Sequence, residues 1–208
     1  MLSEEELANL RHLQGILALD DKTTEKLSQE IKTAYIQNYV KKILTAQQFS
    51  PEEEEELTAI LHSLNMESII SDKTRQQLEK YKLYWALKHL PLPVIGTDIA
   101  IQSNESCHFM IGNVKWYELR KVRYKSTSTD ELTLIDQGSL YLTDKRIIFD
   151  GGKKMSTIQL TKILKSTPHS DGVTLGKDSG KDVTLRLPDR ADIFGLMLGR
   201  ITNTHFRV

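Results

Sequence analysis

Residues 138–149 read Gly-Ser-Leu-Tyr-Leu-Thr-Asp-Lys-Arg-Ile-Ile-Phe, the clearest fold signal in the second half of the chain. Its two apolar runs, 139–143 and 146–149, are separated by Asp144-Lys145. Runs rich in β-branched and aromatic residues favour strands, and two residues between them are the length of a tight hairpin turn. The stretch therefore predicts an antiparallel β-hairpin.

Further strand patterns lie on both sides of this hairpin. Gly-Gly, Asp-Gly and Ser-Gly pairs separate short apolar runs, as they do between the strands of an antiparallel sheet. We expect about eight short strands, at 106–111, 115–124, 139–143, 146–149, 154–160, 163–167, 173–175 and 182–187. Such regular spacing favours an antiparallel barrel or sandwich.

The C-terminal end returns to helical spacing after Pro188-Asp189. Apolar residues then recur on one face of a helix: Ile193, Phe194, Met197, Leu198 and Ile201. We expect one helix that closes the β-domain.

The first 90 residues have a helical pattern, with Gly15 and Pro51 as the only glycine and proline. Ser3-Glu4-Glu5-Glu6 has the form of a capping box and precedes Leu7, Leu10, Leu13 and Leu17, which share a helix face. Ser50-Pro51-Glu52-Glu53 combines a serine cap, a proline at the first helical position and acidic residues in the first turn. Both segments predict helix starts.

A shift of 47 residues aligns these two helix starts and many of the residues after them. It places Leu10 on Leu57, Leu13 on Ile60, Leu17 on Leu64, Ile31 on Leu78 and Ile36 on Leu83. Each copy is a short helix, a loop and a longer helix, so we expect a four-helix unit whose two pairs bury each other's apolar faces. Chance similarity between two amphipathic hairpins is the alternative.

The domain boundary is predicted at Leu90-Pro91-Leu92-Pro93, because alternating prolines exclude helix and favour an extended path. Residues 1–90 form the helical domain and residues 91–208 the β-domain. The fold class is α+β: an all-α four-helix domain followed by an antiparallel β-barrel or sandwich with a C-terminal helix.

Charge and composition exclude several classes of protein. The chain has 28 Lys and Arg against 28 Asp and Glu, so no overall field favours nucleic acid. Residues 1–90 hold 11 basic and 15 acidic residues, and residues 91–208 hold 17 and 13. The acidic N-terminus and the lack of long apolar runs argue against export and membrane spanning. The single Cys107 is expected to be a small buried side chain, and we expect a cytoplasmic protein.

No motif for catalysis, metal or cofactor binding occurs in the sequence. The six histidines lack zinc-ligand spacing, no loop has the calcium series, and no phosphate-binding glycine pattern is present. We therefore expect no catalytic residues, no metal and no cofactor, and a protein that is not an enzyme.

The segment 115–125 is the strongest candidate for a binding site. Lys121, Arg123 and Lys125 alternate along it, so a strand projects them from one face, with Val122 and Tyr124 on the other. The candidate residues for an anionic ligand are Lys115, Lys121, Arg123, Lys125, Lys153 and Lys154. The alternative is a solvated strand face whose charge is balanced by Asp130, Glu131 and Asp136.

Three segments of the second half resemble small bacterial PH and GRAM-type domains. They are Gly138 with the Leu-Thr-x-x-Arg hairpin after it, residues 158–163, and Asp171-Gly172-Val173. This resemblance implies two nearly orthogonal sheets with the C-terminal helix in one open end. The helix start at Ser50 is similar to that of TerB-like and EF-hand-like helical domains, although Ala46-Gln47-Gln48-Phe49 lacks their acidic residues.

Both resemblances imply binding, and neither fixes a chemistry. We expect an adaptor that presents a sheet edge or groove to a protein or peptide. The alternative is a peripheral module at the inner face of the membrane, binding anionic lipid or phosphoinositide headgroups through the basic strand. The partner and the oligomeric state are left open.

Overall fold

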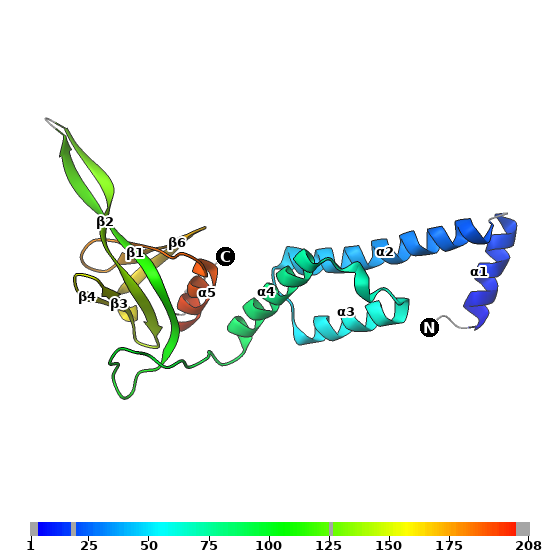
Figure 1. Ribbon diagram of the computed structural model, residues 1–208, viewed down its shortest axis with the longest axis horizontal. Coiled ribbons are helices and arrows are strands. Elements are labelled where there is room, and N and C mark those ends of the chain that lie inside the picture. Colours follow the sequence, from blue (N-terminus) through cyan, green and yellow to red (C-terminus); the bar gives the residue numbers. More distant parts are fainter. Residues whose placement is uncertain (1–3, 18–19, 125–126, 203–208) are drawn as a thin grey trace. The chain divides into compact units, whose positions relative to one another are not determined.

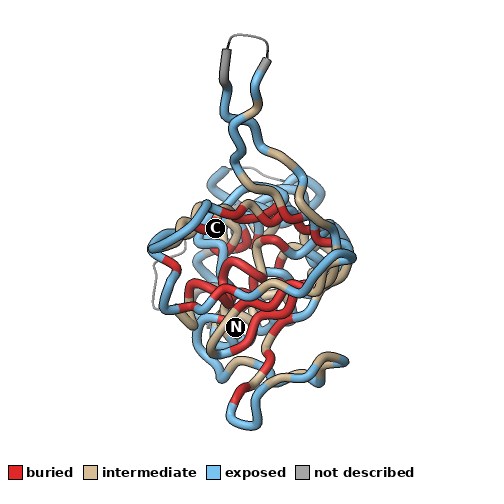
Figure 2. The backbone as a smooth tube through the Cα atoms, turned by 90° about the vertical axis from the view of Figure 1, so that its left-hand side faces the viewer, coloured by how far each residue is buried: buried red, intermediate tan, exposed pale blue. Residues whose placement is uncertain are grey.

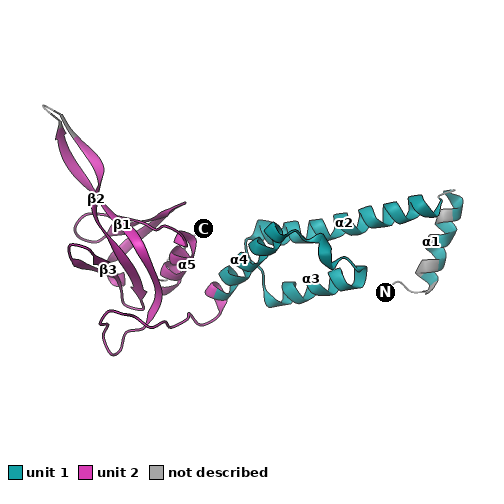
Figure 3. Ribbon diagram, in the orientation of Figure 1, with its two compact units in different colours: residues 1–86 teal, residues 87–208 magenta. Residues whose placement is uncertain are grey.

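The computed structural model describes residues 4–17, 20–124 and 127–202. Internal contacts divide the chain into two compact units, Met1–Ala86 and Leu87–Val208 (Figure 3). The predicted domain boundary at 90/91 stays a prediction.

Unit 1 contains the four predicted helices (Figure 1). They are α1 (Glu4–Ile16), α2 (Asp21–Ala46), α3 (Pro51–Leu64) and α4 (Asp72–His89), with the 3₁₀ turn η1 (Glu67–Ile69) before α4. The start of α3 has the predicted capping box, since the Ser50 hydroxyl accepts from the Glu53 amide and the Glu53 carboxylate accepts from the Ser50 amide. The cap predicted at Ser3 lies outside the described residues.

The core of unit 1 comes from the second half of α2, from α3 and from α4. Its buried apolar residues are Ile36, Val40, Ile43, Phe49, Leu57, Leu78, Tyr81 and Tyr84. The shared core predicted for both helix pairs is therefore present for the second half of α2 but wrong for α1 and the first half of α2: Leu13 is 51% exposed, and Ile31 is 69% exposed where its counterpart Leu78 is 5% exposed. The reason is that α2 is one continuous helix on which Ile31 lies on the side away from Ile36 and Val40.

Unit 2 is a seven-stranded antiparallel sheet closed by one helix, which confirms the predicted fold class. The strands lie in the order β4-β3-β2-β1-β7-β6-β5. Their bounds are β1 Cys107–Tyr124, β2 Thr127–Thr143, β3 Arg146–Gly151, β4 Met155–Gln159, β5 Ile163–His169, β6 Gly172–Lys177 and β7 Val183–Arg186, with the 3₁₀ turn η2 (Leu160–Lys162) before β5 and α5 at Ala191–Ile201.

The number of strands is seven where about eight are expected from the sequence, because two predicted strands are one. Residues 106–111 and 115–124 belong to the single strand β1, which continues through an irregularity between Ile111 and Val114. Asn113 lies there with φ of 59°, a left-handed conformation that asparagine tolerates and that suits a bulge. The resemblance to PH-like domains implies two sheets, but the structure has one continuous sheet, since β1 pairs with both β2 and β7.

One core fills the inside of this sheet. The predicted face of α5 belongs to it, with Phe194 fully buried and its ring 5.5 Å from that of Phe109. A second, smaller cluster covers part of the outer side: Ile95, Ile99 and Ile101 pack on Cys107, Tyr141 and Ile148. We call residues 95–105 the strap, because they bind across the outer side of β1, β2 and β3.

Two side-chain contacts hold the strap. The Tyr141 hydroxyl donates to Asp98 at 2.6 Å, and Arg146 donates twice to the buried Glu105, at 2.9 Å each. The outer side near Tyr141 is therefore covered.

Candidate functional site

The first part of β2 and the last part of β1 form a two-stranded ribbon that projects from the sheet (Figure 1). The two strands pair from Tyr117 with Leu134 to Tyr124 with Thr127. Pairing of β1 with β7 ends at Glu118, and pairing of β2 with β3 begins at Gly138, so no third strand continues along the ribbon among the described residues. Figure 2 shows the projecting part almost wholly as exposed or half-buried chain.

One face of the ribbon carries an apolar cluster. Cross-strand partners point to the same side of an antiparallel pair, so Tyr117 lies beside Leu134 and Leu119 beside Leu132. The exposed fractions of the three leucines are 50% for Leu119, 43% for Leu132 and 48% for Leu134. We call this side, with Lys115, Lys121, Arg123 and Asp130, the ribbon face.

Cations lie at both ends of this apolar cluster. Lys121 and Arg123 come after it toward the end of the ribbon, and Lys115 precedes it on the same side of β1. Among the described residues these three form no ion pair. Arg186 of β7, the cross-strand partner of Lys115, adds a fourth charge.

Arg186 is held at the edge of the apolar cluster. Its guanidinium carbon lies 5.4 Å from the centroid of the Tyr117 ring, within the range of a cation–π contact. Its Nε lies 3.5 Å from the Asp171 carboxylate. The ribbon face is thus a strip of apolar side chains with basic residues before and after it.

The other side of β1 has a different character. Glu118 accepts hydrogen bonds there from Trp116 Nε1 at 3.3 Å and from Arg120 at 3.2 Å. Because Arg120 is paired with Glu118 on this side, it adds nothing to the basic charge of the ribbon face.

The remaining candidate lysines are placed differently. Lys153 and Lys154 lie in the turn between β3 and β4, where the Lys153 amide donates to Asp136 at 3.0 Å and its ammonium donates to the Ile135 carbonyl at 3.0 Å. Hydrogen bonds from the Lys153 and Gln137 amides lower the pKa of Asp136, the Lys153 amide most strongly. This turn holds the base of the ribbon, and Lys125 lies outside the described residues.

The structure therefore brings Lys115, Lys121 and Arg123 together on one face and leaves Lys153 engaged elsewhere. Sequence reasoning missed the leucines of β2 and Arg186. The alternation of Leu132 and Leu134 indicates a strand, but only the hairpin register shows that they lie beside Tyr117 and Leu119.

The described part of the chain meets neither the requirements of a metal site nor those of a membrane-spanning helix. No group of three or more histidine, cysteine, aspartate or glutamate side chains is arranged to hold a metal ion there. None of the described helices is both long and apolar enough to cross a bilayer.

The chain matches no protein-family model and no curated protein. Among solved structures it resembles the Vps36 N-terminal PH domain, with 15% identity and a TM-score of 0.39 over 53% of this chain and 90% of that chain. It also resembles the C-terminal domain of an unknown protein from Leishmania infantum, with 12% identity and a TM-score of 0.28 over 41% and 80%.

The fold class rests on the observed strand order and the closing helix, and these distant likenesses add nothing to it. The relation of unit 1 to TerB-like domains and the relation of unit 2 to GRAM-type domains stay predictions.

Proposed function

We propose that this chain is a non-enzymatic binding protein whose PH-like domain engages a partner protein through the ribbon face. The observation that carries this proposal is the cluster of the exposed Leu119, Leu132 and Leu134 and the half-buried Tyr117 between basic residues. Contiguous exposed apolar side chains, especially with a polar rim, are typical of interaction sites. A two-stranded ribbon is also only marginally stable by itself, so a partner that covers one side stabilises it.

The partner's chemistry is set by the charges. An apolar segment with acidic residues on both sides fits a strip that has Lys115 at one end and Lys121 and Arg123 at the other. Arg186 is already paired with Asp171 and adds little to this charge. In such an interface the apolar centre supplies most of the affinity, and the rim charges steer the encounter and reject basic partners.

Binding to an anionic membrane is the second candidate, and the exposed Lys115, Lys121 and Arg123 favour it. A basic residue near an anionic surface contributes about 1 kcal/mol. A partner protein is preferred because the leucines lie between the cations, while the residues farther along this face of the ribbon, Lys121, Arg123 and Asp130, are charged. A ribbon that inserted by its end would carry polar residues into the bilayer first.

The experiment compares the full-length wild type with the double variant Leu119→Asp, Leu132→Asp in affinity capture from the native host. Leu164→Asp is the matched control, because Leu164 is 70% exposed and lies on β5, away from the ribbon. We expect a protein that the wild type and the control retain and the ribbon variant loses. If all three chains retain the same proteins, the ribbon face is not the binding site.

Flotation with phosphatidylserine vesicles separates the two candidates. A lipid-binding ribbon predicts flotation of the wild type that Lys121→Glu with Arg123→Glu abolishes. A partner-protein ribbon predicts no flotation of the wild type at physiological salt, with capture lost in both the leucine and the charge variants.

A further inference from the structure

The first helix pair exposes a large apolar surface. Leu13 and Ile16 at the end of α1 and Leu17 directly after it are 51%, 65% and 63% exposed. On the first half of α2, Leu27, Ile31 and Tyr35 recur at four-residue spacing and are 41%, 69% and 55% exposed. Six large apolar side chains on two adjoining helices are far more than scattered surface residues.

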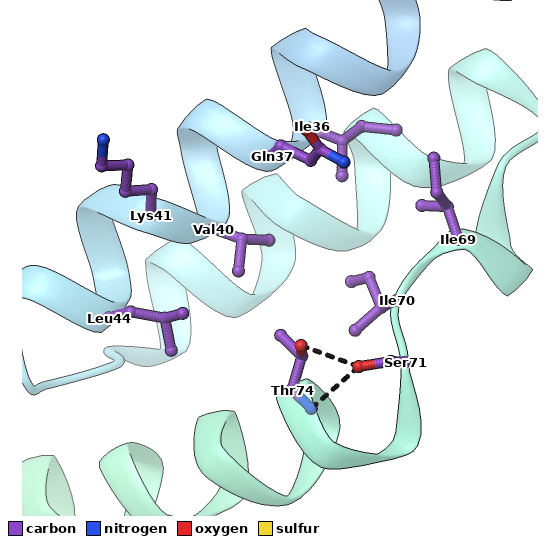
Figure 4. Close-up of a pocket in the computed structure, with 9 residues that line it drawn as sticks. All are labelled: Ile36, Gln37, Val40, Lys41, Leu44, Ile69, Ile70, Ser71 and Thr74. Carbon is purple, nitrogen blue, oxygen red and sulfur yellow. Dashed lines mark hydrogen bonds between the residues drawn. The ribbon is translucent and has the colours of Figure 1, made fainter.

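The rest of unit 1 contains a groove with an aliphatic centre and polar residues beside it (Figure 4). It has a volume of about 330 Å³ and lies between the second half of α2 and the segment that leads from η1 into α4. Its aliphatic lining is Ile36, Val40, Leu44, Ile69 and Ile70. Ser71 and Thr74 are hydrogen-bonded to each other at 2.9 Å, and Lys41 is the charged residue of the lining.

The α1 helix is too short to reach this groove within its own chain. It has 13 residues and is about 20 Å long. Val40 lies about 28 Å along α2 from the start of that helix at Asp21. Folded back along α2 from the connection at 17–20, α1 ends beside the first half of α2, short of Val40.

We propose that α1 of a second copy of this chain occupies the groove, and that the exchange is reciprocal. Each copy then inserts its α1 between α2 and α4 of the other. The interface is the same from both sides, so the association closes as a dimer and does not grow into a filament.

Charge and chain symmetry both favour α1 as the occupant. Its first turn is acidic in sequence and includes the exposed Glu5. Lys41 borders the groove with its side chain directed outward (Figure 4), so its ammonium lies at the rim, where an acidic helix end can meet it. Within the 47-residue repeat, α1 corresponds to α3, whose Leu57 is 4% exposed on α2. A helix of this pattern thus already packs on α2 in unit 1. The dimer would also bring together the exposed faces of Leu27, Ile31 and Tyr35.

The test measures the mass of the full-length chain in solution by light scattering and sedimentation across a range of concentrations. We expect a dimer for the wild type and a monomer for Leu13→Asp with Ile16→Asp. Ala8→Asp is the matched control, because Ala8 is also exposed on α1 but lies about 140° around the helix from Leu13. The control is expected to stay dimeric.

A complementation experiment identifies the exchange itself. Leu44→Asp with Ile70→Asp spoils the groove and leaves α1 intact, and circular dichroism checks that this variant keeps its helices. Alone, the α1 variant and the groove variant are each expected to be monomeric. Mixed, they are expected to form a heterodimer, because one intact α1 meets one intact groove.

If the groove variant loses its helices, Lys41→Glu replaces it, since Lys41 is exposed and its substitution cannot disturb the core. This variant is expected to weaken the dimer, and Glu5→Lys in the same chain is expected to restore it. A wild type that is monomeric at all concentrations overturns the proposal. So does a dimer that survives both the α1 and the groove variants, since α1 would then lie on its own α2 or the groove would hold another ligand.

Discussion

At the scale of single residues, the strap depends on one buried carboxylate. Glu105 accepts from the Thr143 hydroxyl at 2.7 Å and from the Gln102 amide at 3.1 Å, in addition to the two bonds from Arg146. Burial by itself raises the pKa of Glu105, but these hydrogen bonds and the charge of Arg146 outweigh it and lower the pKa to about 2. The charged form is therefore favoured in the folded state.

Replacement of Glu105 by Gln tests this contact through its pH dependence. A carboxyl with a lowered pKa stabilises the fold above its ordinary value near 4.5, and that stabilisation is lost as the pH falls toward 2. At pH 7 we expect Glu105→Gln to lower the free energy of unfolding by about 3 kcal/mol. The difference from the wild type should shrink steadily below pH 4.5.

Urea unfolding at a series of pH values measures this difference, with the exposed Glu131→Gln as control. A constant difference between wild type and variant from pH 7 to pH 2 would contradict the assignment. No sequence pattern points to this contact, because Glu105 and Arg146 are far apart in the chain and each is an ordinary charged residue in its own segment.

At the scale of elements, the start of α3 is the most predictable feature of unit 1. A capping box is a local signal, readable from four consecutive residues, and the structure has both of its hydrogen bonds. Ser50→Ala removes the side-chain acceptor for the Glu53 amide. We expect it to lower the free energy of unfolding by about 1 kcal/mol, as measured by urea titration of helical circular dichroism. Ser68→Ala, at an exposed position, should have little effect, and equal losses in both variants would contradict the role of the cap.

Elements that depend on register are less predictable. The hairpin at 139–149 can be predicted with its turn, but the ribbon cannot, because residues 129–134 are polar at many positions and none of them belongs to the core. Their strand character comes from pairing with β1, which a single strand's pattern cannot reveal. For the same reason the sequence indicates the cations of β1 and not the leucines beside them on β2.

At the scale of the whole molecule, the change from helical to alternating spacing near Pro91 predicts the fold class. It also predicts two domains that unfold separately. Scanning calorimetry of the full chain at pH 7 should show two transitions, with Ser50→Ala lowering one and Glu105→Gln lowering the other. A single transition that both variants shift would mean that residues 1–90 and 91–208 unfold as one unit.

Helical spacing in the sequence predicts which segments are helices, but it does not predict which helices pack together. Amphipathic spacing predicts four helices, and four are present in the described part of unit 1, but it also predicts that they bury one another. Spacing tells which side of a helix is apolar and says nothing of whether a neighbour can reach it. The continuous α2 separates Leu27 and Ile31 from the core around Ile43, so the apolar residues of the first pair are left for another surface.

The rate at which the single cysteine reacts with an alkylating reagent can report on opening of the strap. Cys107 has no exposed surface and lies beneath the isoleucines of the strap, and burial raises the pKa of its thiol. An alkylating reagent can modify it only in the moments when residues 95–101 lift away. The rate of Cys107 labelling in the native protein therefore measures how often the strap opens. Tyr141→Phe removes the hydroxyl that holds Asp98, and we expect it to increase this rate.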